Sequence, residues 1–255
     1  MTLLLEPRIE GVTHHGEREP GLLGGLGSGS LNDRCPGSPR RTVGTSRPQC
    51  LKFVPRGNDF DMPSDPLPQA LLVVDLQEDF FTDDDLARQR EALIVACNSV
   101  VEKAQQAEAV VFEIRTIHDA DRSSWSLNML DDDAGMTIES TPGAAAVDGL
   151  MTSGATIVRK TRDSAFHNTP LAEKLGDRGI TAIAICGVST ESCIAMTAAE
   201  AYARDLHVTL VRDALASVDP DAHTHALDRL SRQYRQAITT SGEIEFETCN
   251  ADPIA

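Results

Sequence analysis

Short apolar runs alternate with helical patterns along most of this chain, and this alternation constrains the fold more than any other feature. Residues 70–74 are apolar at every position, which is typical of a parallel strand buried on both faces. Further strand-like runs follow at residues 109–114, 155–159, 181–185, 208–211 and 237–240. Strands that alternate with helices predict an α/β fold with three layers, α-β-α, around a mostly parallel six-stranded sheet.

The segments between these runs carry helix signals. Three aspartates at residues 83–85 precede a stretch, residues 86–107, whose apolar side chains fall on one helical face. Further helices are predicted over residues 170–178, with Thr169 as N-cap, and over residues 194–202 and 220–236. Residues 116–149 are polar with little periodicity, which favours a functional loop region.

The first 68 residues differ in composition from the rest. They hold more than half of the 18 glycines and of the 13 prolines, and they show no sustained helix or strand period. We expect residues 1–68 to be a mostly disordered extension and residues 69–255 to form the folded domain. An upstream extension or a mis-assigned start is the alternative interpretation of this segment.

Charge and cysteine content limit the partners that this chain is expected to have. The net charge of −16 belongs entirely to residues 69–255 and should repel nucleic acid and anionic membranes. No apolar run approaches the roughly 20 residues that span a bilayer. The six cysteines lack the spacing of a zinc site or a disulfide scaffold. We therefore expect a cytoplasmic protein with reduced thiols and with no nucleic-acid or membrane partner.

Three reactive side chains follow predicted strands. Asp75 comes after residues 70–74, Lys160 after residues 155–159, and Cys193 opens the helix after the fourth strand. Each has a structural alternative: a capping acid, a solvated lysine and a buried apolar thiol. Because the carboxyl ends of parallel strands meet at one edge, their coincidence favours a common site. A thiol in the first turn of a helix is a candidate nucleophile.

With these residues in place, the chain resembles the isochorismatase-like cysteine hydrolase superfamily, which includes nicotinamidases and related amidohydrolases. The resemblance rests on three blocks, 74–80 (VDLQEDF), 160–166 (KTRDSAF) and 187–193 (GVSTESC), supported by residues 197–198 and 212–217. It covers nearly all of residues 69–255. Blocks in this order and at this spacing are strongly specific.

The resemblance implies a catalytic triad of Asp75, Lys160 and Cys193 in a homodimer or homotetramer. It also implies a cis peptide between Val188 and Ser189, which would turn the Ser189 N–H toward the Cys193 N–H to form an oxyanion hole. Lys160 and the helix terminus would favour the Cys193 thiolate, and Asp75 would accept its proton. The implied activity is hydrolysis of a small amide or related C–N bond other than a peptide bond, through a thioester.

The sequence departs from the family pattern at the metal site of nicotinamidases, which is an Asp-x-His-x-x-x-His arrangement after the second strand. The corresponding residues, 116–122, place Thr116 and Arg122 where two ligands would stand. His118 alone is a poor site, so we predict no bound metal and a substrate other than nicotinamide. His118 is then a candidate pocket-lining or helix-capping imidazole.

Other residues are candidates for contact with the substrate. Gln77 is expected to orient Asp75 or a water molecule, with a structural hydrogen bond as the alternative. Trp125 and Phe166 are candidates for an aromatic wall over a small substrate, with plain packing as the alternative. The candidate substrate-binding residues are Gln77, Phe80, His118, Trp125, Phe166 and Val188.

Three other functions stay open. Vinyl-ether hydrolysis of isochorismate would use the acid and the lysine without requiring the thiol. A non-catalytic member of the fold is less consistent with an intact Asp, Lys and Cys set. A redox sensor would pair Cys193 with Cys186, across a turn whose geometry makes a disulfide uncertain.

Overall fold

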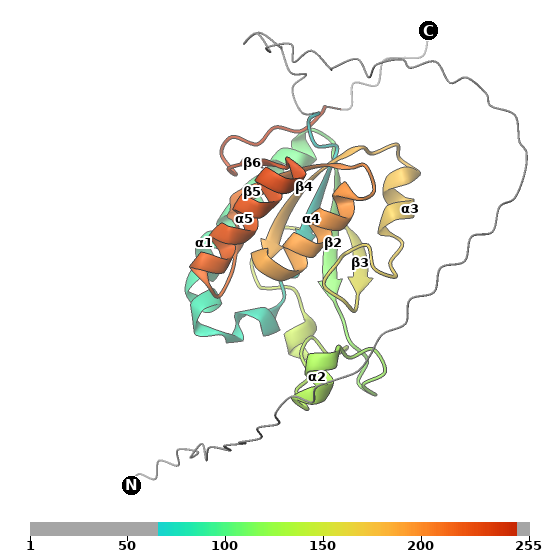
Figure 1. Ribbon diagram of the computed structural model, residues 1–255, viewed down its shortest axis with the longest axis vertical. Helices are drawn as coiled ribbons and strands as arrows, with labels where there is room; N and C mark the ends of the chain where they lie inside the picture. Colours follow the sequence, from blue (N-terminus) through green and yellow to red (C-terminus); the bar gives the residue numbers. More distant parts are fainter. Residues whose placement is uncertain (1–65, 249–255) are drawn as a thin grey trace, which may run out of the picture. The chain divides into compact units, whose positions relative to one another are not determined.

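Six parallel strands form one sheet in the computed structural model, which describes residues 66–248 of the chain. The strand order is β3-β2-β1-β4-β5-β6 and every pairing is parallel, which confirms the predicted α/β class (Figure 1). The strands are β1 (Ala70–Val74), β2 (Val110–Thr116), β3 (Thr156–Lys160), β4 (Ala182–Val188), β5 (His207–Ala216) and β6 (Ala237–Thr239).

Helices cover both faces of this sheet. α1 (Asp84–Gln106) packs on one face, while α3 (Leu171–Gly176), α4 (Ala195–Tyr202) and α5 (Pro220–Tyr234) pack on the other. The carboxyl ends of the strands point toward α2 (Leu127–Asp131) in Figure 1. Three short helical turns complete the described chain: η1 (Glu78–Thr82), η2 (Pro142–Ala144) and the π-helical η3 (Thr190–Ile194).

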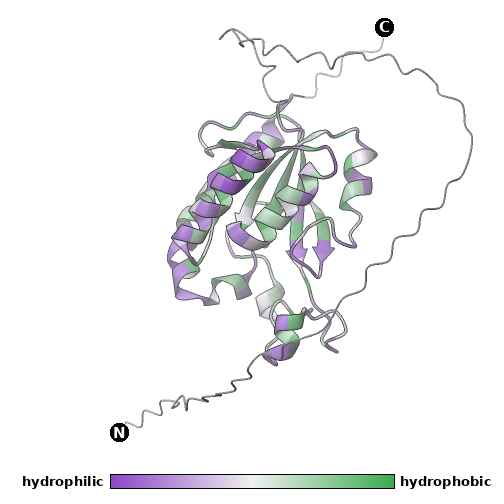
Figure 2. Ribbon diagram, viewed as in Figure 1, coloured by the Kyte–Doolittle hydropathy of each residue, from purple (hydrophilic) through white to green (hydrophobic). Residues whose placement is uncertain are grey.

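β1 shows why a central parallel strand is apolar throughout. Leu71 and Val73 point into the core beneath α1, and Leu72 and Val74 point into the core beneath the helices of the opposite face. All four are almost completely buried, and each such side chain contributes about 1.5–3 kcal/mol of burial free energy. The interior of the sheet is accordingly apolar while the outer helix faces are polar (Figure 2).

Asp83 caps α1 as its side chain accepts a hydrogen bond from Asp85 N at 2.8 Å, so the predicted helix start is confirmed. The predicted helix over residues 170–178 is shorter in the structure, because α3 ends at Gly176 and Gly179 follows with a φ of 64°. Residues 116–149 are not a plain loop, since they contain α2 and η2.

Gly187 allows β4 to approach β1 closely. Its φ is 121°, and a Cβ atom at this position would overlap the carbonyl oxygen of Val74. The pairing of β4 with β5 also shifts in register between Ile185 and Gly187. A glycine is therefore required where the chain leaves β4 for the turn that carries Cys193.

The predicted extension over residues 1–68 falls almost wholly outside the described residues, as do Cys35, Cys50 and Cys249. Within residues 66–248, no helix combines the length and the apolar character needed to cross a membrane.

Candidate active site

The predicted catalytic residues lie where the strand order of the sheet reverses. The chain runs outward from β1 through β2 to β3, and then returns to place β4 on the other side of β1. Asp75 follows β1, and Cys193 lies in η3, which follows β4. Open α/β sheets bind their ligands at the carboxyl ends of the strands at such a switch point.

Asp75 is fixed by contacts to the neighbouring strand β2. Its φ of 53° lies in the left-handed region, which aspartate tolerates better than most residues, and its N–H donates to Ile114 O at 2.9 Å. Carboxylate Oδ1 accepts hydrogen bonds from Thr116 N and Thr116 Oγ1, both at 2.9 Å. Oδ2 lies 2.7 Å from Lys160 Nζ. Both carboxylate oxygens are therefore engaged.

Lys160 connects all the polar groups of the site. It ends β3 and is paired in register with Thr116 at the end of β2. Its ammonium lies 2.7 Å from Asp75 Oδ2, and it donates to Thr116 Oγ1 at 2.7 Å and to Cys193 Sγ at 3.3 Å. An ammonium has three N–H donors, so each has one acceptor. Its side chain is inaccessible to solvent.

Cys193 is 6% exposed, and its sulfur is the most distant of the three partners of the Lys160 ammonium. Burial raises the pKa of Cys193 well above its usual value; the charge of Asp75 adds to this, and the charge of Lys160 opposes it. Burial alone would lower the pKa of Lys160, but Asp75 and Cys193 together raise it. The direction of this shift differs from the thiolate expected from the sequence, because burial and the charge of Asp75 together outweigh the charge of Lys160 at the sulfur.

The turn after β4, which carries Cys193, has an unusual backbone. The peptide between Val188 and Ser189 is cis. η3 is a π-helical turn, in which Ser189 O accepts hydrogen bonds from Ser192 N at 3.2 Å and Ile194 N at 3.1 Å. The sequence predicted Cys193 in the first turn of a regular α-helix. In the structure it lies instead in a widened, π-helical turn ahead of α4.

Known proteins resemble this chain in sequence and in fold. The model of the isochorismatase domain matches residues 69–243. The chain belongs to the isochorismatase family. A probable inactive nicotinamidase of Arabidopsis thaliana is 35% identical over 164 residues, which cover 61% of this chain and 84% of that protein.

Further proteins resemble the chain at lower coverage or identity. A streptothricin hydrolase of Streptomyces noursei is 30% identical over 157 residues, 59% of this chain and 55% of the relative. The structure of an isochorismatase family protein from Desulfovibrio vulgaris superposes with a TM-score of 0.62 at 27% identity, over 68% of this chain and 94% of that one. The chain is thus an isochorismatase-family hydrolase, and the relatives it resembles include a streptothricin hydrolase and a probable isochorismatase.

Thr116 is the residue of the site whose role sequence reasoning missed, because it was considered only as a lost metal ligand. Its hydroxyl donates to Asp75 and accepts from Lys160, and so joins the ion pair. The rule that located Asp75 and Lys160 applies equally to Thr116, since it ends β2. This polar residue at a strand end could have been included on that signal alone.

Gln77 supports the site through hydrogen bonds to the backbone and does not line it. Its side chain is 1% exposed, and Nε2 donates to Thr116 O at 2.8 Å and to Ala144 O at 2.9 Å. Oε1 accepts a hydrogen bond from Thr116 N at 2.8 Å. Both the nitrogen and the oxygen of the Gln77 side-chain amide therefore bond to the backbone. This geometry favours a structural hydrogen-bonding role for Gln77 over orientation of Asp75 or a water molecule.

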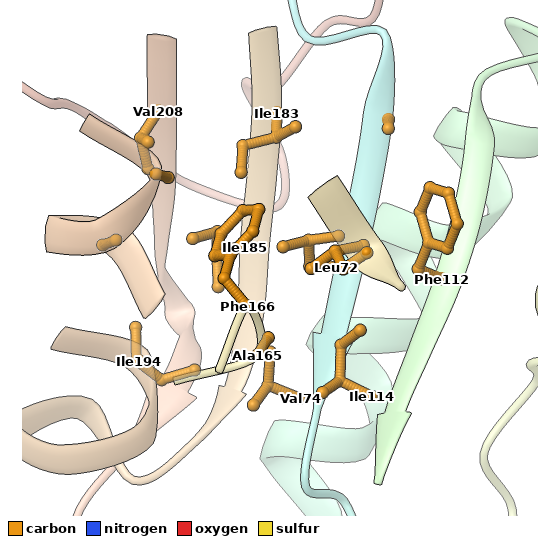
Figure 3. Packing of buried hydrophobic residues seen from close by; sticks show 14 of the residues in the cluster. Leu72, Val74, Phe112, Ile114, Ala165, Phe166, Ile183, Ile185, Ile194 and Val208 are labelled. Carbon is orange, nitrogen blue, oxygen red and sulfur yellow. The ribbon is translucent and has the colours of Figure 1, made fainter. Parts of the chain in front are cut away.

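Three candidate substrate contacts are packing residues. Phe166 is buried in the core against β1 and β4, near Leu72 and Ile185 (Figure 3), and the guanidinium of Arg204 lies 5.1 Å from its ring centroid. Val188 is fully buried on the α1 side of the sheet, and Phe80 packs against the same cluster. Phe166 therefore cannot form the expected aromatic wall, because its ring is enclosed by core side chains.

His118 and Trp125 belong to the segment after β2. His118 Nδ1 donates to Ser124 O at 2.9 Å, and Trp125 Nε1 donates to Asp119 O at 3.1 Å. Burial lowers the pKa of His118, and the positive charges of Arg162 and Lys160 lower it further, so its imidazole is neutral at pH 7. Trp125 is half-buried.

The residues in place of the nicotinamidase ligands do not fit a metal ion. Thr116 Oγ1 is occupied by Asp75 and Lys160, while the Arg122 guanidinium lies 4.6 Å from the Trp125 ring centroid. The same guanidinium is 2.8 Å from Asp133. Within residues 66–248, no group of three His, Cys, Asp or Glu side chains has the arrangement of a metal site.

The suggested pairing of Cys186 with Cys193 is not possible in this fold. Cys186 is buried on the face of the sheet beneath α1, together with Cys97, whereas Cys193 lies on the opposite face. The sheet separates the two sulfur atoms. A redox sensor that forms this disulfide is therefore excluded for the described structure.

Proposed function

We propose that this chain is an amidohydrolase that cleaves a small amide or related C–N bond through a thioester on Cys193. One observation carries the proposal: the buried ammonium of Lys160 contacts both the Asp75 carboxylate, at 2.7 Å, and the Cys193 sulfur, at 3.3 Å. A base, a nucleophile and a cation in mutual contact are what nucleophilic catalysis on a carbonyl requires.

The first half-reaction forms the acyl-enzyme. As the substrate displaces water, Asp75 accepts the Cys193 proton and the sulfur attacks the carbonyl carbon. The Lys160 charge stabilises the sulfur while it loses its proton, and the N–H groups of Ser189 and Cys193 stabilise the oxyanion. Losing one such donor typically costs 100- to 1000-fold in rate. Asp75 then returns the proton to the leaving nitrogen, the C–N bond breaks, and ammonia or an amine departs.

The second half-reaction regenerates the thiol. A water molecule gives a proton to Asp75 as it attacks the thioester carbonyl, and the C–S bond breaks. The proton on Asp75 passes to the sulfur, which restores the neutral thiol that burial and Asp75 favour. The products are a carboxylic acid and the free enzyme.

Nicotinamide is not the substrate that we propose. In place of two metal ligands the chain has Thr116, which serves the ion pair, and Arg122, which covers Trp125. A relative described as a probable inactive nicotinamidase also speaks against nicotinamide hydrolysis by this chain. The alternative function is vinyl-ether hydrolysis of isochorismate, which the matched family model favours.

The test is a substrate panel of small amides together with isochorismate, with ammonia and pyruvate measured as separate products. We expect ammonia or an amine from at least one amide and no pyruvate from isochorismate. On that amide, Cys193→Ala should abolish turnover and leave the circular dichroism spectrum unchanged.

The matched control is Cys97→Ala, which removes a buried thiol from the opposite face of the sheet. This variant should keep the wild-type rate. Near-normal turnover by Cys193→Ala would show that the covalent mechanism is wrong. Pyruvate release that survives this substitution would support the vinyl-ether alternative.

A further inference from the structure

A second carboxylate, that of Asp163, contacts the thiol from the solvent side. Cys193 Sγ lies 3.9 Å from Asp163 Oδ1, whereas Asp75 and Lys160 meet the same sulfur from the interior. Asp163 is exposed, and Asp75 is fully buried. Asp163 is thus an exposed carboxylate within 3.9 Å of the sulfur, where a molecule bound at the thiol could contact it.

The segment that carries Asp163 is tied to α4, the helix that follows Cys193. Ala165 N donates to Thr197 Oγ1 at 3.0 Å, and Ser164 Oγ donates to Glu200 Oε2. Ser164 and Thr197 are both buried. The position of the Asp163 backbone relative to the sulfur is thus set by contacts within the fold.

The arginine next to Asp163 is directed elsewhere. Arg162 Nη1 donates to Ser124 O at 2.8 Å, and Nη2 donates to Trp125 O at 3.4 Å, so its guanidinium joins the segment after β2. Among residues 66–248, no lysine, arginine or histidine forms an ion pair with Asp163. A negative charge next to the nucleophile is left for a ligand to neutralise.

We propose that Asp163 is a specificity-determining residue that selects amides carrying a positively charged nitrogen two or three bonds from the scissile carbonyl carbon. An ammonium hydrogen-bonded to the carboxylate lies about 2.8 Å from it, and an attacked carbon lies about 3–3.5 Å from the sulfur. With 3.9 Å between Oδ1 and Sγ, these distances suit amides of α- or β-amino acids.

Neutralising Asp163 would also assist the reaction. Its charge is one of the causes that raise the pKa of Cys193. A substrate cation bound to Asp163 would offset this effect and ease the transfer of the thiol proton to Asp75. The net charge of −16 would further attract cationic substrates from solution. This inference rests on the proposed function, since it assigns a substrate class to the same site.

The test compares two reagents that modify thiols and differ mainly in charge, 2-aminoethyl and propyl methanethiosulfonate. The first places an ammonium three bonds from the attacked sulfur, close to the spacing proposed for substrates. The rate at Cys193 is followed by mass spectrometry of its peptide, because the chain has six cysteines. The ratio of the two rates cancels any change in the reactivity of the thiol itself.

Asp163→Asn should lower the ratio of the modification rate with the cationic reagent to that with the neutral reagent by about fivefold or more. This factor corresponds to about 1 kcal/mol, the interaction energy of two unit charges 4 Å apart in water. Asp163→Glu should keep most of the preference. The control, Asp177→Asn, removes an equal charge at the end of α3, before β4 begins, and should leave the ratio unchanged.

An unchanged ratio in Asp163→Asn, or an equal fall in Asp177→Asn, would overturn the inference. The reagents need no turnover, so this result would leave the acyl-enzyme proposal standing. Failure of that proposal is detected separately, by activity that survives Cys193→Ala.

Discussion

Lys160 Nζ lies 2.7 Å from Asp75 Oδ2, and the side chains of both residues are inaccessible to solvent. Taking two charges out of water costs several kcal/mol per ion, so a buried pair of this kind contributes little net stability. The same ammonium also contacts the Cys193 thiol, at 3.3 Å. The pair is therefore better explained by the chemistry of the sulfur than by the stability of the fold.

Removing Lys160 should destabilise the protein, because the Asp75 carboxylate would remain buried without its partner. We expect Lys160→Met to lower the free energy of unfolding by about 3–5 kcal/mol. The double variant Asp75→Asn/Lys160→Met should regain most of this stability while remaining inactive. Urea denaturation followed by circular dichroism measures both. A single variant as stable as the wild type would show that the pair is not buried as described.

Thr116 should act as a positioning residue for Lys160. Thr116→Val removes the hydroxyl that accepts from Lys160 and donates to Asp75, while the backbone N–H to Asp75 stays. An unmet buried partner costs about 1–3 kcal/mol, so we expect kcat/KM to fall by about tenfold or more, mostly in kcat.

Thr116→Ser supplies the control, since it keeps the hydroxyl and should restore most of the rate. A role in packing alone predicts the reverse order, with valine tolerated better than serine. The pH profile separates the two roles further, because only the loss of the hydroxyl should displace the ionisation of the site.

The reactivity of Cys193 should rise at a higher pH than the reactivity of an ordinary thiol. Its pKa is raised, so the fraction of thiolate at pH 7 is smaller than for free cysteine, and alkylation by iodoacetamide should increase with an inflection above about 8.5. Asp75→Asn removes one cause of the shift and should move this inflection to lower pH. Peptide mass spectrometry reports the rate at Cys193 alone. An inflection below that of free cysteine in the wild type would contradict this description.

Much of the fold could be predicted because its signals are local. The continuous apolar run of β1 and the aspartate cap of α1 are each encoded within a few residues. Strand order is not local. The sequence cannot tell that β3 is an edge strand two positions from β1, or that Lys160 must cross Thr116 to reach Asp75.

The remaining site residues depend on tertiary contacts that no motif displays. Phe166 and Gln77 lie inside family-like blocks, and only packing decides that they face the core and the backbone rather than the substrate. Asp163 also lies in such a block, but as an exposed residue three positions beyond a strand it was not singled out. The π-helical turn at Cys193 was also invisible, because it differs from an α-helix by a single hydrogen-bond register.

The covalent role of Cys193 is tested most directly by intact-mass spectrometry of the protein, quenched with acid during turnover of an amide identified in the panel. The account predicts a species heavier than the protein by the acyl group, located on the Cys193 peptide and absent from Cys193→Ala. Rapid turnover with no adduct at any quench time, or an adduct that persists in Cys193→Ala, would contradict it.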